Sequence, residues 1–309
     1  MITEKIVLGS QYPLDGLLTI PDTGNGPYPA VVLVHGSGAN DMDTKIRGIR
    51  PFKDAAEGLA KHGIAAIRYN KRTYTYGRAL IKAMGNSLTV KEETIEDAVF
   101  AADFLRKDSR INSDKIYIAG HSMGGMLAPR IDAEGGNFAG IIILAGSPRK
   151  LEEILKEQQD GFLKSAKGIV KWLAGKQIKK YTAKLDRIYD LSDEEAKKVP
   201  FAGGTTLYYL KEWGMKPSAD YLKNSTKPIL VMHGDKDLQV STDKDFEGYK
   251  SILSNHPDAT FKLYPDLNHC FMPALYSDVS KATKEFKLER HVEDYVIADM
   301  ADWINAHAR

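Results

Sequence analysis

Runs of consecutive apolar residues alternate along this chain with segments in which apolar residues recur every three or four positions. The first pattern predicts strands covered on both faces, and the second predicts amphipathic helices. Buried strands are predicted at residues 30–34, 65–69, 116–119, 140–146 and 229–233, and a last strand is predicted at 260–264. Helices are predicted at residues 51–62, 95–105, 123–133, 243–253 and 292–306. This alternation predicts an α/β fold with a doubly wound, mostly parallel sheet, preceded by antiparallel strands at 6–9 and 14–20.

The alternation stops between residues 147 and 227. This stretch contains no convincing strand, and its amphipathic segments are rich in lysine, as at Leu151, Ile154 and Leu155. Because the strand pattern resumes at residue 228, we predict one core domain formed by residues 1–146 and 228–309. Residues 147–227 are then a helical insertion, and we predict that it forms a lid over the carboxyl edge of the sheet.

Composition excludes several classes of function. The 309 residues include 43 Lys and Arg against 41 Asp and Glu, a formal charge of +2, so no nucleic-acid or anionic-membrane partner is expected. No apolar run approaches the ~20 residues of a membrane span, and the N-terminus lacks the features of a signal peptide, which predicts a cytoplasmic protein. One cysteine, Cys270, excludes an internal disulfide, and no nucleotide-binding or metal-binding motif is present. We therefore expect no cofactor and no metal; the oligomeric state is left open.

The segment 116–125 carries the strongest chemical signal. An apolar strand runs into the sequence Gly120–His121–Ser122–Met123–Gly124, and a segment compatible with a helix follows. A G-x-S-x-G motif between a strand and a helix predicts a nucleophile elbow, a sharp turn that exposes the serine hydroxyl above the sheet. Glycine is required at both ends because side chains there would collide with the neighbouring strand and helix. Ser122 is therefore the candidate nucleophile.

A serine nucleophile needs a base to take its proton, and the base needs an acid to fix its tautomer. In elbow proteins the chain order is serine, acid, histidine. After the strand at 229–233, both Asp235 and Asp237 are candidate acids; Asp237 is favoured, because Asp235 suits a turn that bonds local backbone. Of eight histidines, His269 alone follows the last predicted strand in a loop, so it is the candidate base.

Acyl transfer also needs N–H donors for the oxyanion. The elbow supplies the N–H of Met123, and the turn after the strand at 30–34 supplies a second N–H, for which we choose that of Ser37.

Lys71 and Arg72 are open to two interpretations. They could contact an anionic leaving group, or they could lie in a solvated loop, which is the preferred interpretation. An aromatic cluster in the insertion includes Tyr208, Tyr209 and Trp213. These residues could form a wall of the substrate pocket, or they could dock the insertion on the core.

Four motifs together resemble the α/β-hydrolase superfamily, and within it the branch of dienelactone hydrolases and prolyl-oligopeptidase-like enzymes that includes small carboxylesterases. They are Val34–His35–Gly36–Ser37–Gly38, Gly120–His121–Ser122–Met123–Gly124–Gly125, His233–Gly234–Asp235–Lys236–Asp237 and Asn268–His269. The segment 68–74 supports this branch, although Asn70 stands where such relatives often have aspartate before Lys-Arg. The resemblance implies an eight-stranded sheet, Ser122, Asp237 and His269 as the triad, Ser37 and Met123 as oxyanion donors, and no cofactor.

The residues and the resemblance together predict a serine hydrolase that cleaves carboxylic esters, short-chain or aryl, through an acyl-enzyme. A thioesterase or a hydrolase of small peptides would use the same triad, so these alternatives stay open. A ligand-binding module without catalysis is disfavoured, because such a module has no need to keep serine, acid and histidine in this order.

Overall fold

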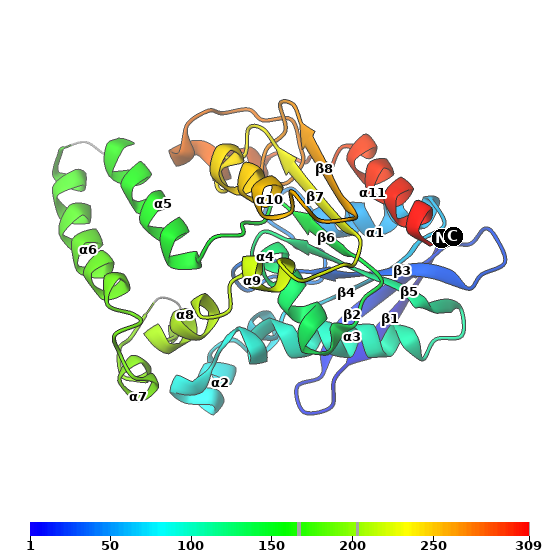
Figure 1. Ribbon diagram of the computed structural model, residues 1–309, viewed down its shortest axis with the longest axis horizontal. Helices are drawn as coiled ribbons and strands as arrows, with labels where there is room; N and C mark the ends of the chain where they lie inside the picture. The colour runs from blue at the N-terminus through cyan, green and yellow to red at the C-terminus, as the bar shows by residue number, and fades with distance from the viewer. Residues whose placement is uncertain (166–167, 202–203, 309) are drawn as a thin grey trace.

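The computed structural model describes residues 1–165, 168–201 and 204–308, and its centre is one eight-stranded sheet (Figure 1). The strand order is β1-β2-β4-β3-β5-β6-β7-β8. The first four strands in the chain are β1 (Ile2–Leu8), β2 (Leu14–Ile20), β3 (Tyr28–Val34) and β4 (Ala65–Tyr69). The others are β5 (Ile111–His121), β6 (Ile141–Leu144), β7 (Ile229–Gly234) and β8 (Ala259–Tyr264).

Strand direction agrees with the hydrophobic pattern. β1 pairs with β2, and β2 with β4, in antiparallel register, which confirms the antiparallel lead-in. From β4 to β8 every neighbouring pair is parallel. The parallel strands of the sheet's centre are apolar at consecutive positions because both of their faces are covered. The doubly wound, mostly parallel sheet predicted from the sequence is thus present.

The two faces of the sheet are covered by different helices. Along β3, Val31 and Leu33 join one apolar cluster, whereas Val32 and Val34 join the other, as the period of two in a strand requires. The first cluster includes residues of α1 (Pro51–Lys61) and α11 (Asp294–His307). The second includes residues of α3 (Glu96–Arg106), α4 (Met123–Ile131) and α10 (Glu247–Ile252).

The core also includes one further helix and several 3-10 and π-helical turns. They are the helix α2 (Arg72–Met84), the 3-10 turns η1 (Gly85–Ser87) and η6 (Val279–Lys287), and the π-helical turns η2 (Lys91–Ile95), η3 (Asp132–Gly136) and η5 (Thr242–Phe246). The part of the chain that the structure describes includes no helix that is both long and apolar enough to cross a membrane.

The prediction of a solvated loop at Lys71 and Arg72 is wrong. Lys71 precedes α2, which is interrupted at Gly77, and both cationic side chains are buried. Arg72 pairs with the buried carboxylate of Asp97 on α3, and Lys71 pairs with Glu93 on η2. The physical reason is that each cation meets a carboxylate that is distant in the sequence, Glu93 for Lys71 and Asp97 for Arg72, and local sequence does not reveal such a pairing.

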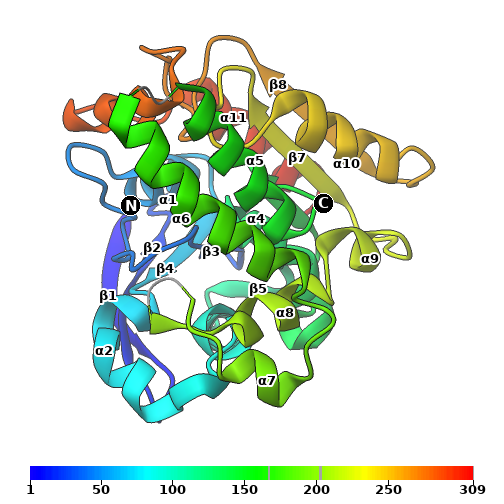
Figure 2. The same cartoon turned by 90° about the vertical axis from the view of Figure 1, so that its left-hand side faces the viewer.

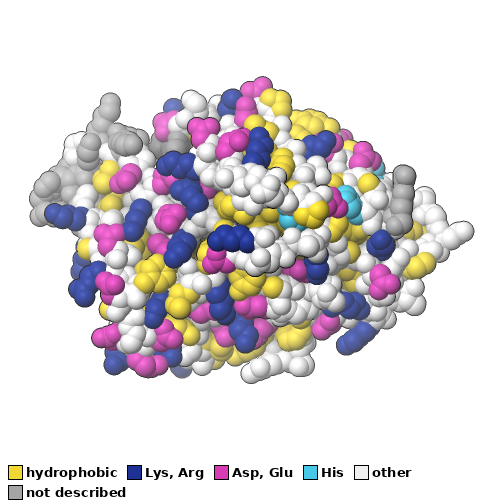
Figure 3. Space-filling view, in the orientation of Figure 1, with side chains coloured by type: hydrophobic (Ala, Val, Ile, Leu, Met, Phe, Trp, Pro, Cys, Tyr) yellow, Lys and Arg dark blue, Asp and Glu magenta, His cyan; other side chains and the backbone are white. Residues whose placement is uncertain are grey.

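The insertion is the segment of the chain between β6 and β7. It consists of α5 (Leu151–Ser165), α6 (Gly168–Asp186), α7 (Asp193–Lys197), α8 (Leu207–Gly214) and α9 (Ser218–Leu222). In Figure 1, α5 and α6 form a pair at the left end of the molecule. In Figure 2 this pair lies in front of the sheet. On the face shown in Figure 3, cationic and anionic side chains are intermixed rather than gathered into a patch of one sign.

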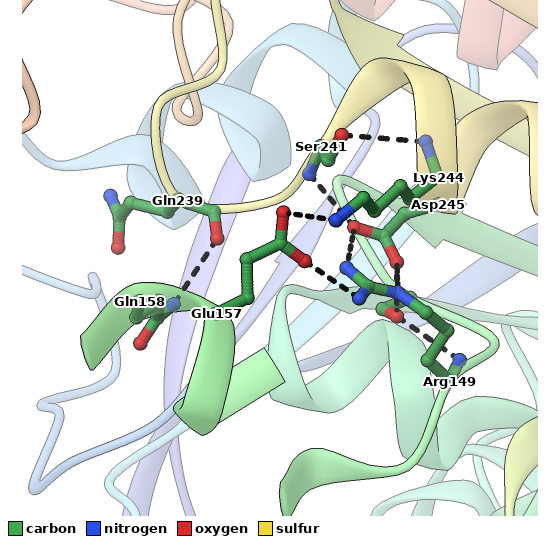
Figure 4. Close-up of polar contacts among 8 residues, drawn as sticks. Arg149, Glu157, Gln158, Gln239, Ser241, Lys244 and Asp245 are labelled. Carbon is green, nitrogen blue, oxygen red and sulfur yellow. Dashed lines mark hydrogen bonds and ion pairs between the residues drawn. The ribbon is translucent and has the colours of Figure 1, made fainter. Parts of the chain in front are cut away.

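Ion pairs fix the first helix of the insertion to the core (Figure 4). Arg149, just before α5, donates to both carboxylate oxygens of Asp245, at 2.6 and 2.9 Å. It also donates to Glu157 on α5, at 2.7 Å. Lys244 donates to the second oxygen of Glu157, at 2.8 Å. Asp245 is completely buried and also accepts from Ser147. Arg149 therefore joins α5 to the segment that follows β7.

Replacing Arg149 with methionine should destabilise the protein. We expect Arg149→Met to lower the free energy of unfolding by about 3 kcal/mol, at the low end for a broken buried pair because Ser147 and Ser241 still donate to Asp245. Urea denaturation measures the loss. The double variant Arg149→Met, Asp245→Asn is the control and should be more stable than the single variant, since no buried charge is left unpaired. A loss below about 0.5 kcal/mol in the single variant would contradict this assignment.

Candidate active site

Ser122 occupies a strained turn between β5 and α4. Its backbone angles are φ 55° and ψ −115°, in the region that favours glycine. Its N–H donates to the carbonyl of Leu144 on β6, at 2.8 Å, and its own carbonyl accepts from Met126 of α4. Such strain in a non-glycine residue persists only where surrounding structure enforces it, and it concentrates at functional sites. The turn thus has the geometry of a nucleophile elbow.

Close backbone approaches explain the glycines of the elbow. A Cβ atom at Gly120 would lie 2.1 Å from the carbonyl oxygen of Gly124, and one at Gly124 would lie 2.2 Å from that of Val34 on β3. Both contacts are with backbone, so neither can be relieved by moving a side chain. The steric requirement inferred from the motif is present at both positions.

His269 and Asp237 lie in contact at the carboxyl edge of the sheet. Nδ1 of His269, in the loop after β8, is 2.6 Å from Oδ2 of Asp237, in the loop after β7. The other oxygen of Asp237 accepts from the backbone N–H groups of Gln239 and Val240, at 2.7 and 3.0 Å. Burial by itself would raise the pKa of Asp237, but the charge of His269 and these hydrogen bonds hold that pKa below its ordinary value. Asp237 is therefore a carboxylate at neutral pH.

Asp235 does not reach His269. Its Oδ1 accepts from the N–H of Asp266, at 2.7 Å, and its Oδ2 is 3.0 Å from Nζ of Lys236. This is the local turn role considered for it in the sequence. Of the two candidate acids, the fold brings only Asp237 to the histidine.

The loop that carries His269 is held by a buried network that the sequence did not reveal. Oδ1 of Asn268 accepts from the N–H groups of Cys270 and Met272, at 3.0 and 3.2 Å. The amide of Asn268 donates to Glu285, which is also buried. The ring nitrogen Nε2 of His121 is 2.9 Å from the carbonyl oxygen of His269. Because these contacts fix the backbone on both sides of His269, they orient its ring. Asn268 and His121 stand in motifs noted in the sequence, whereas Glu285 carried no sequence signal.

One cavity of about 400 Å³ brings the candidate residues together. Ser122, Met123, Ser37 and His269 all line it. Ser37 follows β3, and the turn before it packs against the elbow, since a Cβ atom at Gly36 would lie 3.2 Å from Cβ of Ser122. The cavity also has an apolar wall formed mainly by α5 of the insertion and by α4. The apolar residues of these two helices that line it are Leu151, Ile154, Leu155, Met123 and Met126.

The aromatic residues predicted as a possible pocket wall lie elsewhere. None of Tyr208, Tyr209 and Trp213 is among the residues that line this cavity. Tyr209 and Trp213 are buried in the apolar cluster, edge to face with each other, and the hydroxyl of Tyr209 donates to Glu93. Tyr208 lies under the ammonium of Lys197. The alternative interpretation, docking of the insertion on the core, describes the contact of Tyr209 with Glu93, whereas Tyr208 contacts Lys197 within the insertion.

Two histidines beside the site are buried and uncharged. Burial, together with the charge of Lys71, lowers the pKa of His35 to about 3. Burial and the charge of His269 lower the pKa of His121 to about 4. Both rings are therefore neutral at neutral pH. Burial likewise raises the pKa of the Cys270 thiol, so this cysteine is not a thiolate nucleophile.

The lowered pKa of His35 predicts a pH-dependent stability. Between about pH 6.5 and pH 3 the unfolded chain binds a proton at His35 and the folded chain does not, so the free energy of unfolding falls as pH falls. The contribution is about 1.4 kcal/mol per pH unit for one such group. His35→Gln should reduce the slope of stability against pH by this amount, measured by urea denaturation from pH 7 to pH 4. His62→Gln, at an exposed histidine whose side chain has no ion pair among the described residues, is the control. An unchanged slope in His35→Gln would show that this ring is protonated in the folded protein.

Within residues 1–165, 168–201 and 204–308, no group of three or more His, Cys, Asp or Glu side chains is arranged to hold a metal ion. The chemistry available at the site is that of a hydroxyl, an imidazole and a carboxylate.

Comparison with known proteins identifies the family of this chain. Residues 27–273 match the family described as serine aminopeptidase, S33. Over 293 residues the chain is 35% identical to Esterase EstD from Thermotoga maritima; this covers 94% of the chain but 65% of that relative, so the chain spans less than two thirds of its length.

Solved structures share the fold. Est1E from Butyrivibrio proteoclasticus superposes with a TM-score of 0.56 at 17% identity, covering 96% of this chain and 99% of that one. A dienelactone hydrolase from Anabaena variabilis superposes with a TM-score of 0.55 at 15% identity, covering 99% and 97%. With the sheet order, the elbow at Ser122 and a family match over most of the sequence, the chain belongs to the serine aminopeptidase S33 family, within the α/β-hydrolase superfamily.

Proposed function

We propose that this protein is a serine hydrolase of carboxylic esters, with Ser122 as nucleophile, His269 as base and Asp237 as acid. The observation that carries the proposal is the convergence on one cavity edge of a strained elbow serine and a histidine whose Nδ1 is held by a buried carboxylate. The 35% identity to Esterase EstD favours an ester as substrate.

In the proposed reaction, Ser122 Oγ attacks the ester carbonyl carbon while Nε2 of His269 takes its proton. Asp237 keeps the proton of the neutral ring on Nδ1 and stabilises the imidazolium that forms. The tetrahedral intermediate collapses, His269 protonates the leaving alcohol, and the acyl group stays on Ser122. Water then attacks the acyl-enzyme with His269 again as base, which releases the acid and restores the serine.

The negative charge of the intermediate would be met by two backbone donors. The N–H of Met123 lies in the first turn of α4, where N–H groups have no partners inside the helix. Among the described residues none accepts a hydrogen bond from the N–H of Ser37, which lines the same cavity. We assign these two groups as the oxyanion donors.

The cavity favours substrates of modest size. A volume of about 400 Å³ lies near the lower end of the range for small-molecule sites, about 300–1,000 Å³. We propose that the insertion is the lid of this cavity, because α5 contributes its apolar wall, and that short-chain or aryl esters fit beneath it. A lid fixed by the Arg149 ion pairs limits the length of the acyl group.

Two measurements test the proposal. A fluorophosphonate should label the protein at Ser122, and absence of labelling would favour a non-catalytic binding module. Turnover should then be compared on p-nitrophenyl esters of increasing chain length, on an acyl-CoA and on aminoacyl-anilides. Fastest turnover of short or aryl esters supports the proposal, whereas faster turnover of long-chain triglyceride emulsions contradicts it. Preference for the anilides would favour the peptide hydrolase suggested by the family description.

A further inference from the structure

A buried lysine contacts the turn that carries the candidate oxyanion donor. Lys71, at the carboxyl end of β4, is 1% exposed. Its Nζ donates to the carbonyl oxygen of Gly36, at 3.1 Å, and is 2.9 Å from Oε1 of Glu93. Its own N–H donates to the carbonyl of Asn40, at 3.0 Å. Both ends of Lys71 are therefore bound to the turn 36–40 that follows β3.

The carbonyl that Lys71 holds belongs to the same peptide unit as the N–H of Ser37. That unit is trans, so its C=O and N–H bonds point in opposite directions within one plane. A donor fixed on the Gly36 oxygen thus fixes the direction of the Ser37 N–H, which must point away from Lys71. A cation on the carbonyl oxygen also polarises the peptide and makes its N–H a stronger donor, because hydrogen bonds in a chain reinforce one another.

Resting on the proposed function, we infer that Lys71 is a positioning residue that orients and strengthens the Ser37 oxyanion donor. Lys71 does not touch the substrate, since it is absent from the residues that line the cavity. The amide of Asn40 also donates to the Gly36 carbonyl, at 3.2 Å, but it is shared with the carbonyls of Ser37 and Gly38 and carries no charge. Lys71 supplies the charge-assisted contact, which is the stronger kind.

The position of the ammonium is set from the insertion. Oε1 of Glu93 pairs with Lys71 and accepts from Thr73, at 3.4 Å, while Oε2 accepts from the hydroxyl of Tyr209 on α8. A charge buried in this way needs a partner of opposite sign, and Glu93 is that partner. The chain of contacts Tyr209–Glu93–Lys71–Gly36 thus connects the docked helix of the insertion to the turn beside the elbow.

The test removes the charge without leaving a buried ion unpaired. In the double variant Lys71→Met, Glu93→Gln the glutamine can still accept from Tyr209, so folding should persist. With p-nitrophenyl butyrate as substrate, kcat should fall about tenfold or more, and KM should change less than about twofold. The fall in kcat should be smaller than the factor of about 10²–10³ expected when a whole oxyanion donor is lost. The affinity of a trifluoromethyl ketone, whose adduct with Ser122 carries the oxyanion, should fall by the same factor.

The matched control is Arg72→Met, Asp97→Asn. It removes the neighbouring buried ion pair, which lies outside the cavity-lining residues and has no contact with Gly36. We expect kcat and ketone affinity within about twofold of the unmodified protein, even if stability falls. If the Lys71→Met, Glu93→Gln variant keeps its kcat and its affinity for the ketone, the inference about Lys71 is overturned and the proposed function still stands. An unmodified protein without Ser122-dependent hydrolysis would overturn the proposed function, and the inference with it.

Discussion

The Ser122→Ala variant should lose nearly all hydrolytic activity. Without the hydroxyl no acyl-enzyme forms, and we expect kcat to fall by about 10⁴–10⁶, as for other enzymes in which a triad acts as a unit. Substrate binding should be retained, because the cavity wall from α5 and the two backbone donors are unchanged. The fold should also be retained, although alanine keeps the strained φ of 55° at this turn. Steady-state kinetics on p-nitrophenyl butyrate and mass spectrometry after fluorophosphonate treatment measure both effects.

Ser254→Ala is the control for this experiment. Ser254 is an exposed serine after α10, and its replacement should leave kcat and the labelling unchanged. If the Ser122→Ala protein were still labelled and still cleaved the ester at more than about 1% of the original rate, another residue would be the nucleophile.

The second large effect is expected from Asp237→Asn. Asparagine fills the same space, but its amide donates where the carboxylate accepted, so the His269 ring is driven into the tautomer with its proton on Nε2. That ring cannot take the proton of Ser122, nor is its imidazolium stabilised by a buried negative charge. We expect kcat to fall by about 10⁴, the size of the corresponding effect in chymotrypsin-like enzymes, with KM little changed.

Asp235→Asn provides the matched control, because it makes the same chemical change two residues away in the same loop. Its carboxylate serves a turn contact and the Lys236 side chain, and we expect kcat within a few-fold of the unmodified protein. A larger loss in Asp235→Asn than in Asp237→Asn would reverse the assignment of the acid. Nuclear magnetic resonance of the His269 ring protons would report the change of tautomer directly in the Asp237→Asn protein.

Most of the fold was predictable because its signals are local. The apolar runs at β3 to β7 mark strands covered on both faces, and the spacing of Phe52, Ala55 and Leu59 marks the buried face of α1. The elbow was predictable for the same reason: Gly120 and Gly124 stand at fixed offsets from Ser122, and the strand and helix on either side supply the context. The lengths of the strands were harder to predict. The structure has β1 beginning at Ile2 rather than Ile6, because polar residues on this edge strand hide the apolar pattern.

The supporting residues were not predictable because their partners are distant in the sequence. Lys71 meets Glu93 and Gly36, Arg72 meets Asp97, and Asn268 meets Glu285. In the sequence each is an ordinary charged or polar residue, and the base rate favours solvent exposure for such residues. The aromatic residues of α8 show the same limit, since an amphipathic pattern indicates that Tyr209 and Trp213 are buried but not what they are buried against.

The sequence by itself determined the α/β class and indicated the serine and the histidine that the proposed reaction uses. It did so because strand periodicity, glycine at tight turns and chain order are properties of short segments. Only the tertiary structure decided that Asp237 rather than Asp235 contacts His269, that α5 rather than α8 lines the cavity, and that Lys71 holds the turn at Gly36. Each of these depends on which parts of distant segments meet across the sheet edge, and that is fixed by packing and burial of the whole chain.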